Sequence, residues 1–364
     1  MGTLSALKVL TLKGPPRRRG QIYGQTLRPL ISQGIEMWKG HLKSTGMDPG
    51  KFAHQFVQET ELLDSVKKWT PDLMEEVTGI AEGSGIDFET MFVWQCTDED
   101  WWFRLFERGL GIEGLWSSCS ALGSSRDGDL PSMVAQNLDL PNHFDGLQVL
   151  LHIKGPESLN SFVFAPAGTI GMLGMNKSLG VCVNTLLCLN HAKDGLPVNF
   201  VVRGILEQST LDDAINFLHQ IKHASGQNYI IGDMDRVVDF ECSGNKVSQF
   251  VPYFGSRRVY HTNHSIANDD RRTSIPQNHE ELSQRSRARF GFLESQLKDT
   301  SKSITLETVQ SILASHCVPL CFHNTHKPGE GCTIGSLIMI LSPSPELHLA
   351  LPPPCRREYQ KFGF

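Results

Sequence analysis

The sequence lacks a long hydrophobic run, a strong excess of either charge, an internal repeat and any low-complexity segment. No apolar stretch approaches the ~18 residues that a membrane-spanning helix needs. The opening residues, MGTLSALKVLTLKG, contain no hydrophobic region typical of a secretory signal. The net charge of -5 argues against a dedicated nucleic-acid-binding protein. These absences predict a cytoplasmic protein with no membrane and no nucleic-acid partner.

What the chain does have is the composition of a soluble globular enzyme. Its 364 residues are 40% hydrophobic, which is enough to bury a large core. Nine cysteines make an odd number, and their spacing is irregular. Such a pattern is typical of free thiols in a reducing compartment rather than of a disulfide framework.

Hydrophobic periodicity divides the chain into helix-rich and strand-rich parts. Arg17, Arg18 and Arg19 follow two prolines and are interpreted as a solvated turn. Nearly continuous apolar strands such as SLIMIL predict sheets covered on both faces, so two stacked sheets flanked by helices fit best. The expected helices are 23–42, 52–69, 71–84 with Thr70 as its N-cap, 88–108, one from 198, one after Thr210, 287–296 and 305–316. The expected strands are 7–12, 133–136, 147–153, 161–164, 170–175, 180–185, 229–231, 237–241, 259–262, 334–341 and 347–351, with a polar surface excursion over 267–286.

The segment WSSCSALGSSRDGDLPSMVAQNLDL, residues 116–140, is the strongest candidate for chemistry. It puts Cys119 among small residues at the start of a strand, before a polar turn and a second strand that carries Gln136, Asn137 and Asp139. Nucleophilic catalysis needs an accessible thiol with polar groups brought back beside it, and a hairpin achieves this. The alternative is a buried structural cysteine, with Asp139 serving only a turn.

Three further segments carry polar groups. GMNKSLGVCVNTL ends a strand at Asn184, which is either a site residue or a strand-end turn residue. HTNH puts Asn263 between two histidines, which face opposite ways on a strand and so are not expected to share a metal. CVPLCFHNTHKPGEGC, residues 317–332, invites a zinc reading, but its spacing matches no standard closed site. No metal and no cofactor are therefore predicted.

Taken together and in order, several segments resemble the acyl-coenzyme A:6-aminopenicillanic acid acyltransferase-like proteins, a peptidase family within the N-terminal-nucleophile hydrolases. The resemblance implies a four-layer αββα sandwich with a helical N-terminal segment. It also implies autoproteolysis at the Ser118–Cys119 bond, which would give an α chain 1–118 and a β chain 119–364 that stay associated as one integrated domain. The segments that carry it are GPPRRRGQIYGQTL, VTGIAEGSGIDFETMF, CSALGSSRDGDLPSMVAQNLDL, AGTIGMLGMNKSLGVCVNTL, HTNHS, IGSLIMIL and PPPCRREYQKF.

The resemblance also implies roles for individual residues. Cys119 is the nucleophile, and the α-amine released on it is the base. Asp139 orients that amine. Asn263 is an oxyanion-hole donor, with Asn184 as a second polar group, while the histidines of HTNH support the site.

Two positions depart from the family pattern. Ser118 stands where glycine usually precedes the nucleophile, so cleavage is expected to be slower. CFHN, residues 321–324, lacks the arginine that usually follows the cysteine of this segment, so no preference for a carboxylate-bearing substrate is expected.

The sequence therefore predicts an autoproteolytic cysteine amidohydrolase or acyltransferase. It would form a thioester on Cys119 and pass the acyl group of a small-molecule amide or acyl donor to water or an amine. Two alternatives remain. The chain is an acyl-CoA-dependent amine acyltransferase, or it is an unprocessed, non-catalytic binding relative.

Overall fold

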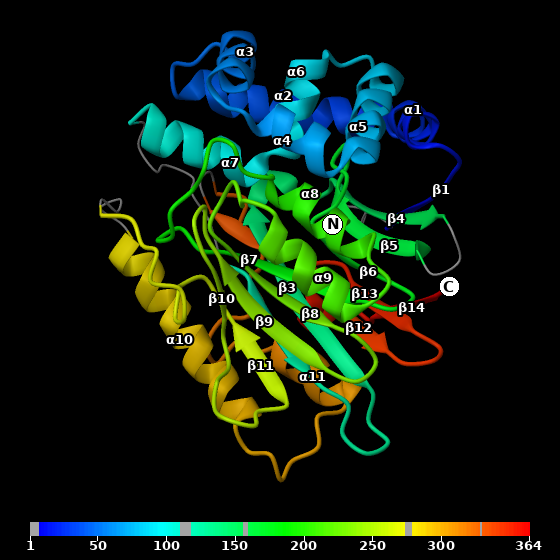
Figure 1. Ribbon diagram of the computed structural model, residues 1–364, viewed down its shortest axis with the longest axis vertical. Helices are drawn as coiled ribbons and strands as arrows, with labels where there is room; N and C mark the ends of the chain where they lie inside the picture. The colour runs from blue at the N-terminus through cyan, green and yellow to red at the C-terminus, as the bar shows by residue number, and fades with distance from the viewer. Residues whose placement is uncertain (1–6, 110–117, 156–158, 274–278, 328–329) are drawn as a thin grey trace.

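Two β-sheets stacked face to face form the centre of the molecule (Figure 1). The computed structural model describes residues 7–109, 118–155, 159–273, 279–327 and 330–364. The eight-stranded sheet has the order β1-β4-β5-β6-β7-β8-β9-β10, and the six-stranded sheet has the order β11-β2-β3-β12-β13-β14. The strands are β1 (Lys8–Lys13), β2 (Ser120–Ser124), β3 (Ser132–Pro141), β4 (Gln148–Lys154), β5 (Ser161–Pro166), β6 (Leu173–Asn176), β7 (Gly180–Thr185), β8 (Gln227–Gly232), β9 (Val237–Cys242), β10 (Val247–Gln249), β11 (Arg258–His261), β12 (Gly331–Leu341), β13 (Glu346–Ala350) and β14 (Gln360–Gly363).

Helices cover the outer face of each sheet. α8 (Val198–Leu206) packs on β6 and β7 of the eight-stranded sheet, and α9 (Leu211–Gln220) packs on α8. α10 (His279–Leu297) and α11 (Leu306–Leu313) pack on the six-stranded sheet, where a second hydrophobic core lies beneath them. The expected αββα sandwich is thereby confirmed.

The N-terminal helices lie together at one end of the sandwich, at the top of Figure 1. They share the main hydrophobic core with the sheets, and β1 pairs in parallel with β4 at the sheet edge. The N-terminal segment is thus built into the same core as the rest of the chain. Its helices are α1 (Pro16–Thr26), α2 (Arg28–Ser44), α3 (Pro49–Glu59), α4 (Leu62–Trp69), α5 (Pro71–Ser84), α6 (Phe88–Gln95), α7 (Thr97–Trp102) and a π-helical turn at Phe103–Glu107.

The arginine-rich segment after Pro15 is the first turn of α1 and not the expected solvated turn. α1 packs tightly on α5: a Cβ atom at Gly20 would lie 2.0 Å from the carbonyl oxygen of Glu76. Glu76 is fully buried and accepts hydrogen bonds from Arg19 Nε at 2.7 Å and from Arg203 Nη1 of α8 at 3.1 Å. Packing and a buried charge therefore fix this segment as a helix, which local composition alone did not indicate.

Several expected boundaries also change. The helices expected at 23–42, 52–69 and 88–108 are each broken into shorter ones, because the chain turns at 27, at 60–61 and at 96. β3 continues through Asn137 and Asp139 to Pro141, so Asp139 is a strand residue rather than a turn residue. Residues 279–286 of the excursion expected at 267–286 belong to α10.

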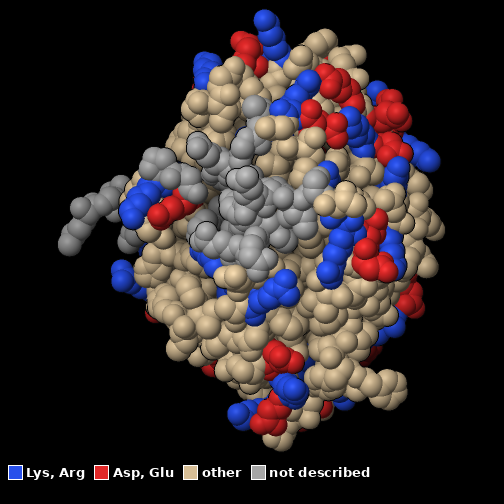
Figure 2. Space-filling view, turned by 90° about the vertical axis from the view of Figure 1, so that its left-hand side faces the viewer, with Lys and Arg blue, Asp and Glu red and all other residues tan. Residues whose placement is uncertain are grey.

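Acidic and basic side chains are interspersed on the face shown in Figure 2, without a large patch of one sign. A search of the described helices for a long apolar span found none able to cross a membrane.

Candidate active site

Cys119 lies one residue before β2, at the mouth of the sandwich, and its side chain is 6% exposed. Side chains alternate along the strand. Cys119 and Ala121 belong to the main core, whereas Leu122 faces the smaller core under α10 and α11. β2 and β3 form the expected antiparallel hairpin pairing, with Ser120 opposite Asn137. Residues 116 and 117 of the predicted segment lie outside the described residues.

The Cys119 thiol holds its proton tightly in the intact chain, because its pKa is raised. Cys119 Sγ donates a weak hydrogen bond to the carbonyl oxygen of Asp139 at 3.8 Å. Burial, followed by the Asp139 carboxyl group, raises the pKa of the Cys119 thiol to about 12. A thiol of this kind needs a nearby base to become a nucleophile.

The Asp139 carboxyl group is buried, and only one of its two oxygens has a hydrogen-bond partner among the described residues. Thr333 Oγ1 donates to its Oδ1 at 2.6 Å, while Oδ2 has no hydrogen-bond partner among the described residues. Burial raises the pKa of Asp139 well above its usual range, although Thr333 and the arginines of α10 act in the opposite direction. The carboxyl group can therefore accept one more donor close to Cys119.

Arg289, on α10, ties Cys119 to Asn263. Its Nη1 donates to the Cys119 carbonyl oxygen at 2.6 Å and to Ser120 Oγ at 2.9 Å, and its Nη2 donates to Asn263 Oδ1 at 2.9 Å. Asn263 Nδ2 donates to the Thr185 carbonyl oxygen at 3.1 Å. The amide oxygen of Asn263 thus points to the arginine and its nitrogen points toward Thr185, which lines the cleft beside Cys119.

The sequence did not single out Arg289, although the helical phase of its segment carries a signal. Ser286, Arg289, Leu293 and Leu297 are all buried and lie three or four residues apart, on one face of α10. An arginine in that phase is expected in the interior, where burial requires partners.

Asn184 lies next to last in β7, on the opposite face from Val183 and Thr185, which line the cleft. Its Oδ1 accepts a hydrogen bond from Asn228 Nδ2 at 3.4 Å, and its Nδ2 has no partner among the described residues. Cys182, on the same face as Asn184, lies close enough to Cys119 for that thiol to affect its pKa. Asn184 therefore faces the other sheet with an unpaired donor.

The two histidines of HTNH go to separate partners. His261 Nε2 donates to Glu241 Oε1 at 2.8 Å across the two sheets, whereas His264 Nδ1 contacts Ser286 Oγ at 2.8 Å. The residues near Cys119 include Asn263, but neither ring bonds to Cys119 or Asp139. The supporting role expected of the two histidines stays a prediction.

A cleft of about 390 Å³ opens beside Cys119 and is lined in part by Asp98, Trp101 and Thr185. Asp98 Oδ2 accepts hydrogen bonds from Thr185 Oγ1 and Gln227 Nε2, each at 2.6 Å. Burial nevertheless raises the pKa of Asp98. Cys119 thus borders a mostly apolar space whose described lining includes two buried acidic groups, Asp98 and Asp139.

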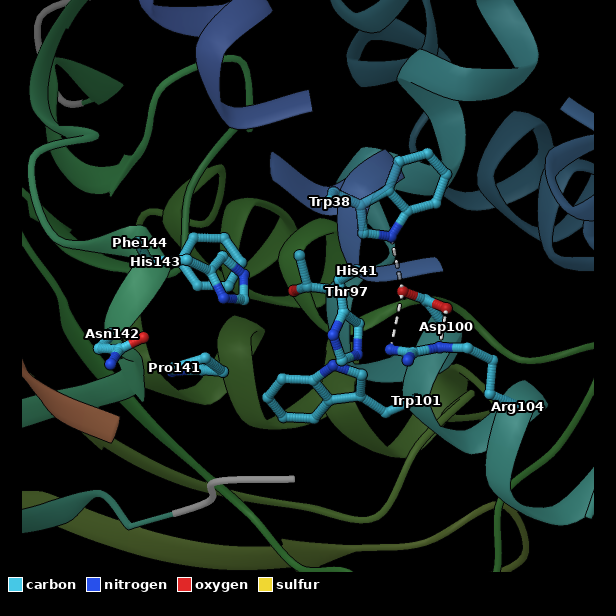
Figure 3. Close-up of a pocket in the computed structure, with 10 residues that line it drawn as sticks. All are labelled: Trp38, His41, Thr97, Asp100, Trp101, Arg104, Pro141, Asn142, His143 and Phe144. Carbon is cyan, nitrogen blue, oxygen red and sulfur yellow. Dashed lines mark hydrogen bonds and ion pairs between the residues drawn. The ribbon is translucent and has the colours of Figure 1, made fainter. Parts of the chain in front are cut away.

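A second hollow of about 520 Å³ adjoins the first, and Trp101 lines both (Figure 3). Its one carboxylate, Asp100, accepts hydrogen bonds from Trp38 Nε1 at 2.9 Å and Arg104 Nε at 2.7 Å. Burial lowers the pKa of His143 to about 4. At neutral pH the lining is therefore aromatic, with its acid and its arginine paired to each other.

The chain is similar to a family of known proteins and to two individual proteins. The family described as acyl-coenzyme A:6-aminopenicillanic acid acyl-transferase matches residues 125–336, more than half of the chain. Protein dcd1A of Dictyostelium discoideum is 27% identical over 244 residues, 58% of this chain and 52% of that protein, so the chain spans about half the length of this curated relative. A variant of conjugated bile acid hydrolase from Clostridium perfringens gives a TM-score of 0.37 at 13% identity over 67% of this chain and 97% of that one.

Proposed function

The chain belongs to the acyl-coenzyme A:6-aminopenicillanic acid acyl-transferase family, and on that premise we propose that it is a self-cleaving thiol amidohydrolase. The observation that carries this proposal is the array in which Arg289 holds both the Cys119 carbonyl oxygen and the Asn263 amide. It joins a buried thiol, a half-satisfied carboxyl group and an oriented amide at one cleft. The free cysteines further support action in a reducing compartment such as the cytoplasm.

The first reaction is maturation. Cys119 Sγ attacks the carbonyl carbon of Ser118, the peptide C–N bond breaks, and the thiol proton passes to the departing nitrogen. Water then hydrolyses the thioester and leaves a carboxyl group on Ser118 and a free α-amine on Cys119. This amine has a reference pKa of about 7.7–8.0, so much of it is neutral and can serve as base for its own thiol.

The second reaction is turnover. The Cys119 amine takes the thiol proton, and Sγ attacks the substrate carbonyl to form an oxyanion. Asn263 donates to that oxyanion, and Asn184, with its unpaired Nδ2, is proposed as the second polar group. The leaving amine receives the proton, and water releases the acid from the thioester. Asp139 orients the amine, because its free oxygen is suited to accept one further donor.

The hollow of Figure 3 suggests which substrates fit. It adjoins the cleft at Trp101, and the described part of its largely aromatic lining carries no unpaired charge at neutral pH. We assign it to a planar, uncharged part of a small-molecule amide, on the far side of Trp101 from the bond that is cleaved. Trp101→Ala should then raise KM more than it lowers kcat for such substrates.

Acyl transfer from an acyl-CoA is the weaker candidate. Coenzyme A phosphates need cations, and the described lining of the two hollows contains one cation, Arg104, which is paired with Asp100. Water is thus the favoured acceptor.

The N-terminal and C-terminal parts are proposed to stay associated after cleavage. Residues before 118 supply β1 to the sheet, much of the main core and the buried Glu76 that binds Arg203. Separation of the chains would expose all of these groups to water.

The intact mass of the purified protein tests self-cleavage. We expect two fragments, 1–118 and 119–364, with cysteine at the new N-terminus. Cys119→Ala should remain one full-length chain and hydrolyse no substrate. Cys182→Ala is the matched control, because it removes a buried thiol beside Cys119 and should leave both reactions intact.

The outcomes separate the candidates. Cleavage in Cys119→Ala would remove this residue from its role. A wild-type protein that stays whole, binds small amides and hydrolyses none would indicate the non-catalytic relative. A processed protein that turns over amides only with an added amine or acyl-CoA would indicate a transferase.

A further inference from the structure

The fold brings together a group of cysteine and histidine side chains that lies outside the proposed active site. His316, Cys321 and His323 follow α11, and Cys355 comes from the C-terminal segment, in a short helical turn at Pro354–Arg356. One nitrogen or sulfur atom from each of the four residues lies within 4.8 Å of the others. Cys321 and His323 belong to the segment 317–332 that is considered for zinc, but no metal is predicted from the sequence, because His316 lies before that segment and Cys355 more than thirty residues beyond His323.

The four atoms match the coordination preferences of Zn²⁺. Structural zinc sites use two cysteines and two histidines in a tetrahedron, with Zn–S of about 2.3 Å and Zn–N of about 2.0–2.1 Å. These bond lengths put neighbouring ligand atoms about 3.3–3.8 Å apart. His323 Nε2 and Cys355 Sγ are 3.1 Å apart, and the rings of His316 and His323 are 5.1 Å apart and nearly perpendicular. Small side-chain rotations therefore suffice to close the tetrahedron.

The backbone that carries these side chains is held in place by other contacts. Asn137 Nδ2 of β3 donates to the carbonyl oxygens of Leu313 at 2.8 Å and Leu320 at 2.7 Å, which fixes both ends of the turn containing His316. On the C-terminal side, the hydroxyl groups of Tyr359 and Ser336 are 2.6 Å apart. Such preorganisation reduces the entropy lost when a metal ion binds.

We propose that His316, Cys321, His323 and Cys355 bind a structural Zn²⁺ ion that fastens the C-terminal segment to the chain after α11. Binding exchanges two thiol protons for one dication, so the site with two thiolates and two neutral imidazoles is uncharged. The segment after α11 that holds Cys321 and His323 adjoins the proposed active site, because Phe322 N–H donates to Thr333 Oγ1 at 2.9 Å and Thr333 in turn donates to Asp139.

Metal analysis of the full-length protein tests this. Wild-type protein made with zinc in the medium and purified without chelators should contain about one zinc per chain. Cys355→Ser and His323→Ala should lose it. Cys317→Ser is the matched control, since Cys317 is an exposed thiol of the same segment outside the cluster, and should keep the metal.

A second measurement uses wild-type protein alone, in case a variant fails to fold. After zinc is stripped with a chelator, alkylation should label Cys355 readily, and added Zn²⁺ should protect it while Cys317 reacts equally in both samples. Zinc should also raise the unfolding temperature of the stripped protein, and Mg²⁺ should not. A zinc-free wild-type protein, equal zinc in Cys355→Ser and Cys317→Ser, or a Cys321–Cys355 disulfide detected by mass would overturn the proposal.

Discussion

Asp139 and Glu241 are buried carboxyl groups on strands of opposite sheets, and their surroundings differ in one respect. Glu241 accepts hydrogen bonds from His261 Nε2 at 2.8 Å and from three successive backbone N–H groups, Ile266 at 2.6 Å, Ala267 at 3.0 Å and Asn268 at 2.6 Å. The Asp139 carboxyl group accepts one hydrogen bond from the described residues, which Thr333 donates. Both carboxyl groups are buried, but among the described residues Glu241 has four hydrogen-bond donors and Asp139 has one.

This difference explains why the two pKa values move in opposite directions. Burial alone would raise the pKa of Glu241, but the bond from His261 and the backbone donors bring it below its usual range. Burial raises the pKa of Asp139, and its single donor does not offset this. A buried carboxylate whose oxygens all have hydrogen-bond donors stabilises the fold. A buried carboxylate with an oxygen that lacks a donor is available for a ligand or a reacting group. The HTNH segment supplies His261 to the Glu241 site and Asn263 to the array around Cys119.

The largest effect on stability is expected when the Glu241 carboxylate is removed. Glu241→Ala leaves His261 and three backbone N–H groups without their acceptor, which should destabilise the protein by about 3–5 kcal/mol. Chemical unfolding of the Cys119→Ala protein with and without this change measures it. Glu241→Gln keeps one acceptor oxygen, so its free energy of unfolding should lie between that of Glu241→Ala and that of the protein with Glu241. An exposed carboxylate, Asp269, provides the control, and Asp269→Ala should leave the unfolding midpoint nearly unchanged.

Asn263 and Asn268 are amides of the same loop whose side chains bind different partners. Asn268 Nδ2 bonds to the backbone of Glu241 at 3.1 Å, whereas Asn263 belongs to the array around Cys119. If Asn263 stabilises the oxyanion, Asn263→Ala should lower kcat by about 10²–10³. The free energy of unfolding should change by about 1 kcal/mol, from the lost bonds to Arg289 and Thr185.

Steady-state kinetics and thermal unfolding of processed protein distinguish the two amides. Asn268→Ala should lower stability and leave kcat near the wild-type value. If Asn263→Ala instead unfolds early and retains its kcat, Asn263 is a structural residue and another donor must stabilise the oxyanion.

The sequence predicted the layers of the fold well because they depend on patterns that are local. Alternating or continuous apolar strands, the N-cap Thr210 and the proline-led helix from Pro71 are all readable within a few residues. The helical start at Pro16 and the break at 60–61 are not, since α1 packs on the distant α5 and the Glu61 N–H donates to the carbonyl oxygen of the distant Lys193.

The candidate site shows the same limit. Motifs that resemble a family identified Cys119, Asp139 and Asn263, and the structure brings all three near Arg289. Arg289 itself carries no motif, and only its phase on a helix marks it as buried. The zinc-type cluster was missed for a related reason: it joins segments that are adjacent only after the C-terminal strand has paired with β13.

Asp139→Asn should produce opposite changes before and after cleavage. In the uncut Cys119→Ala protein the folded pKa of Asp139 is raised, so its contribution favours folding below an unfolded pKa of about 3.9 and declines as pH rises toward the folded value. The asparagine variant lacks this decline and should become relatively more stable with rising pH. Glu241 has a lowered pKa, so its contribution is present above its unfolded pKa and is lost as pH falls through the folded value.

In processed protein the same substitution should weaken catalysis. If the ionised Asp139 carboxylate stabilises the protonated amine of Cys119, its loss should lower the amine's apparent pKa and move the acidic limb of the kcat/KM profile to lower pH. The peak should fall as well, because the amine is no longer oriented. Amine and thiol titrate as a coupled pair, so the direction of the shift is the diagnostic quantity. An unmoved profile in fully processed Asp139→Asn would mean that Asp139 does not contact the amine.

The smallest expected effect concerns Ser118, which is buried beside the proposed scissile bond. Cleavage requires the Ser118–Cys119 peptide to bend toward the thiol, and the Cβ atom of serine narrows the conformations available for this. Ser118→Gly should therefore speed maturation, by about 2–5-fold if the difference in backbone freedom is about 0.5–1 kcal/mol. A time course of fragment appearance after rapid purification measures the rate. Ser117→Gly is the control, because it makes the same change one peptide away from the bond. Slower cleavage with glycine at 118 would mean that serine assists the reaction, for example through its hydroxyl group, and that the departure from the family pattern is not a steric handicap.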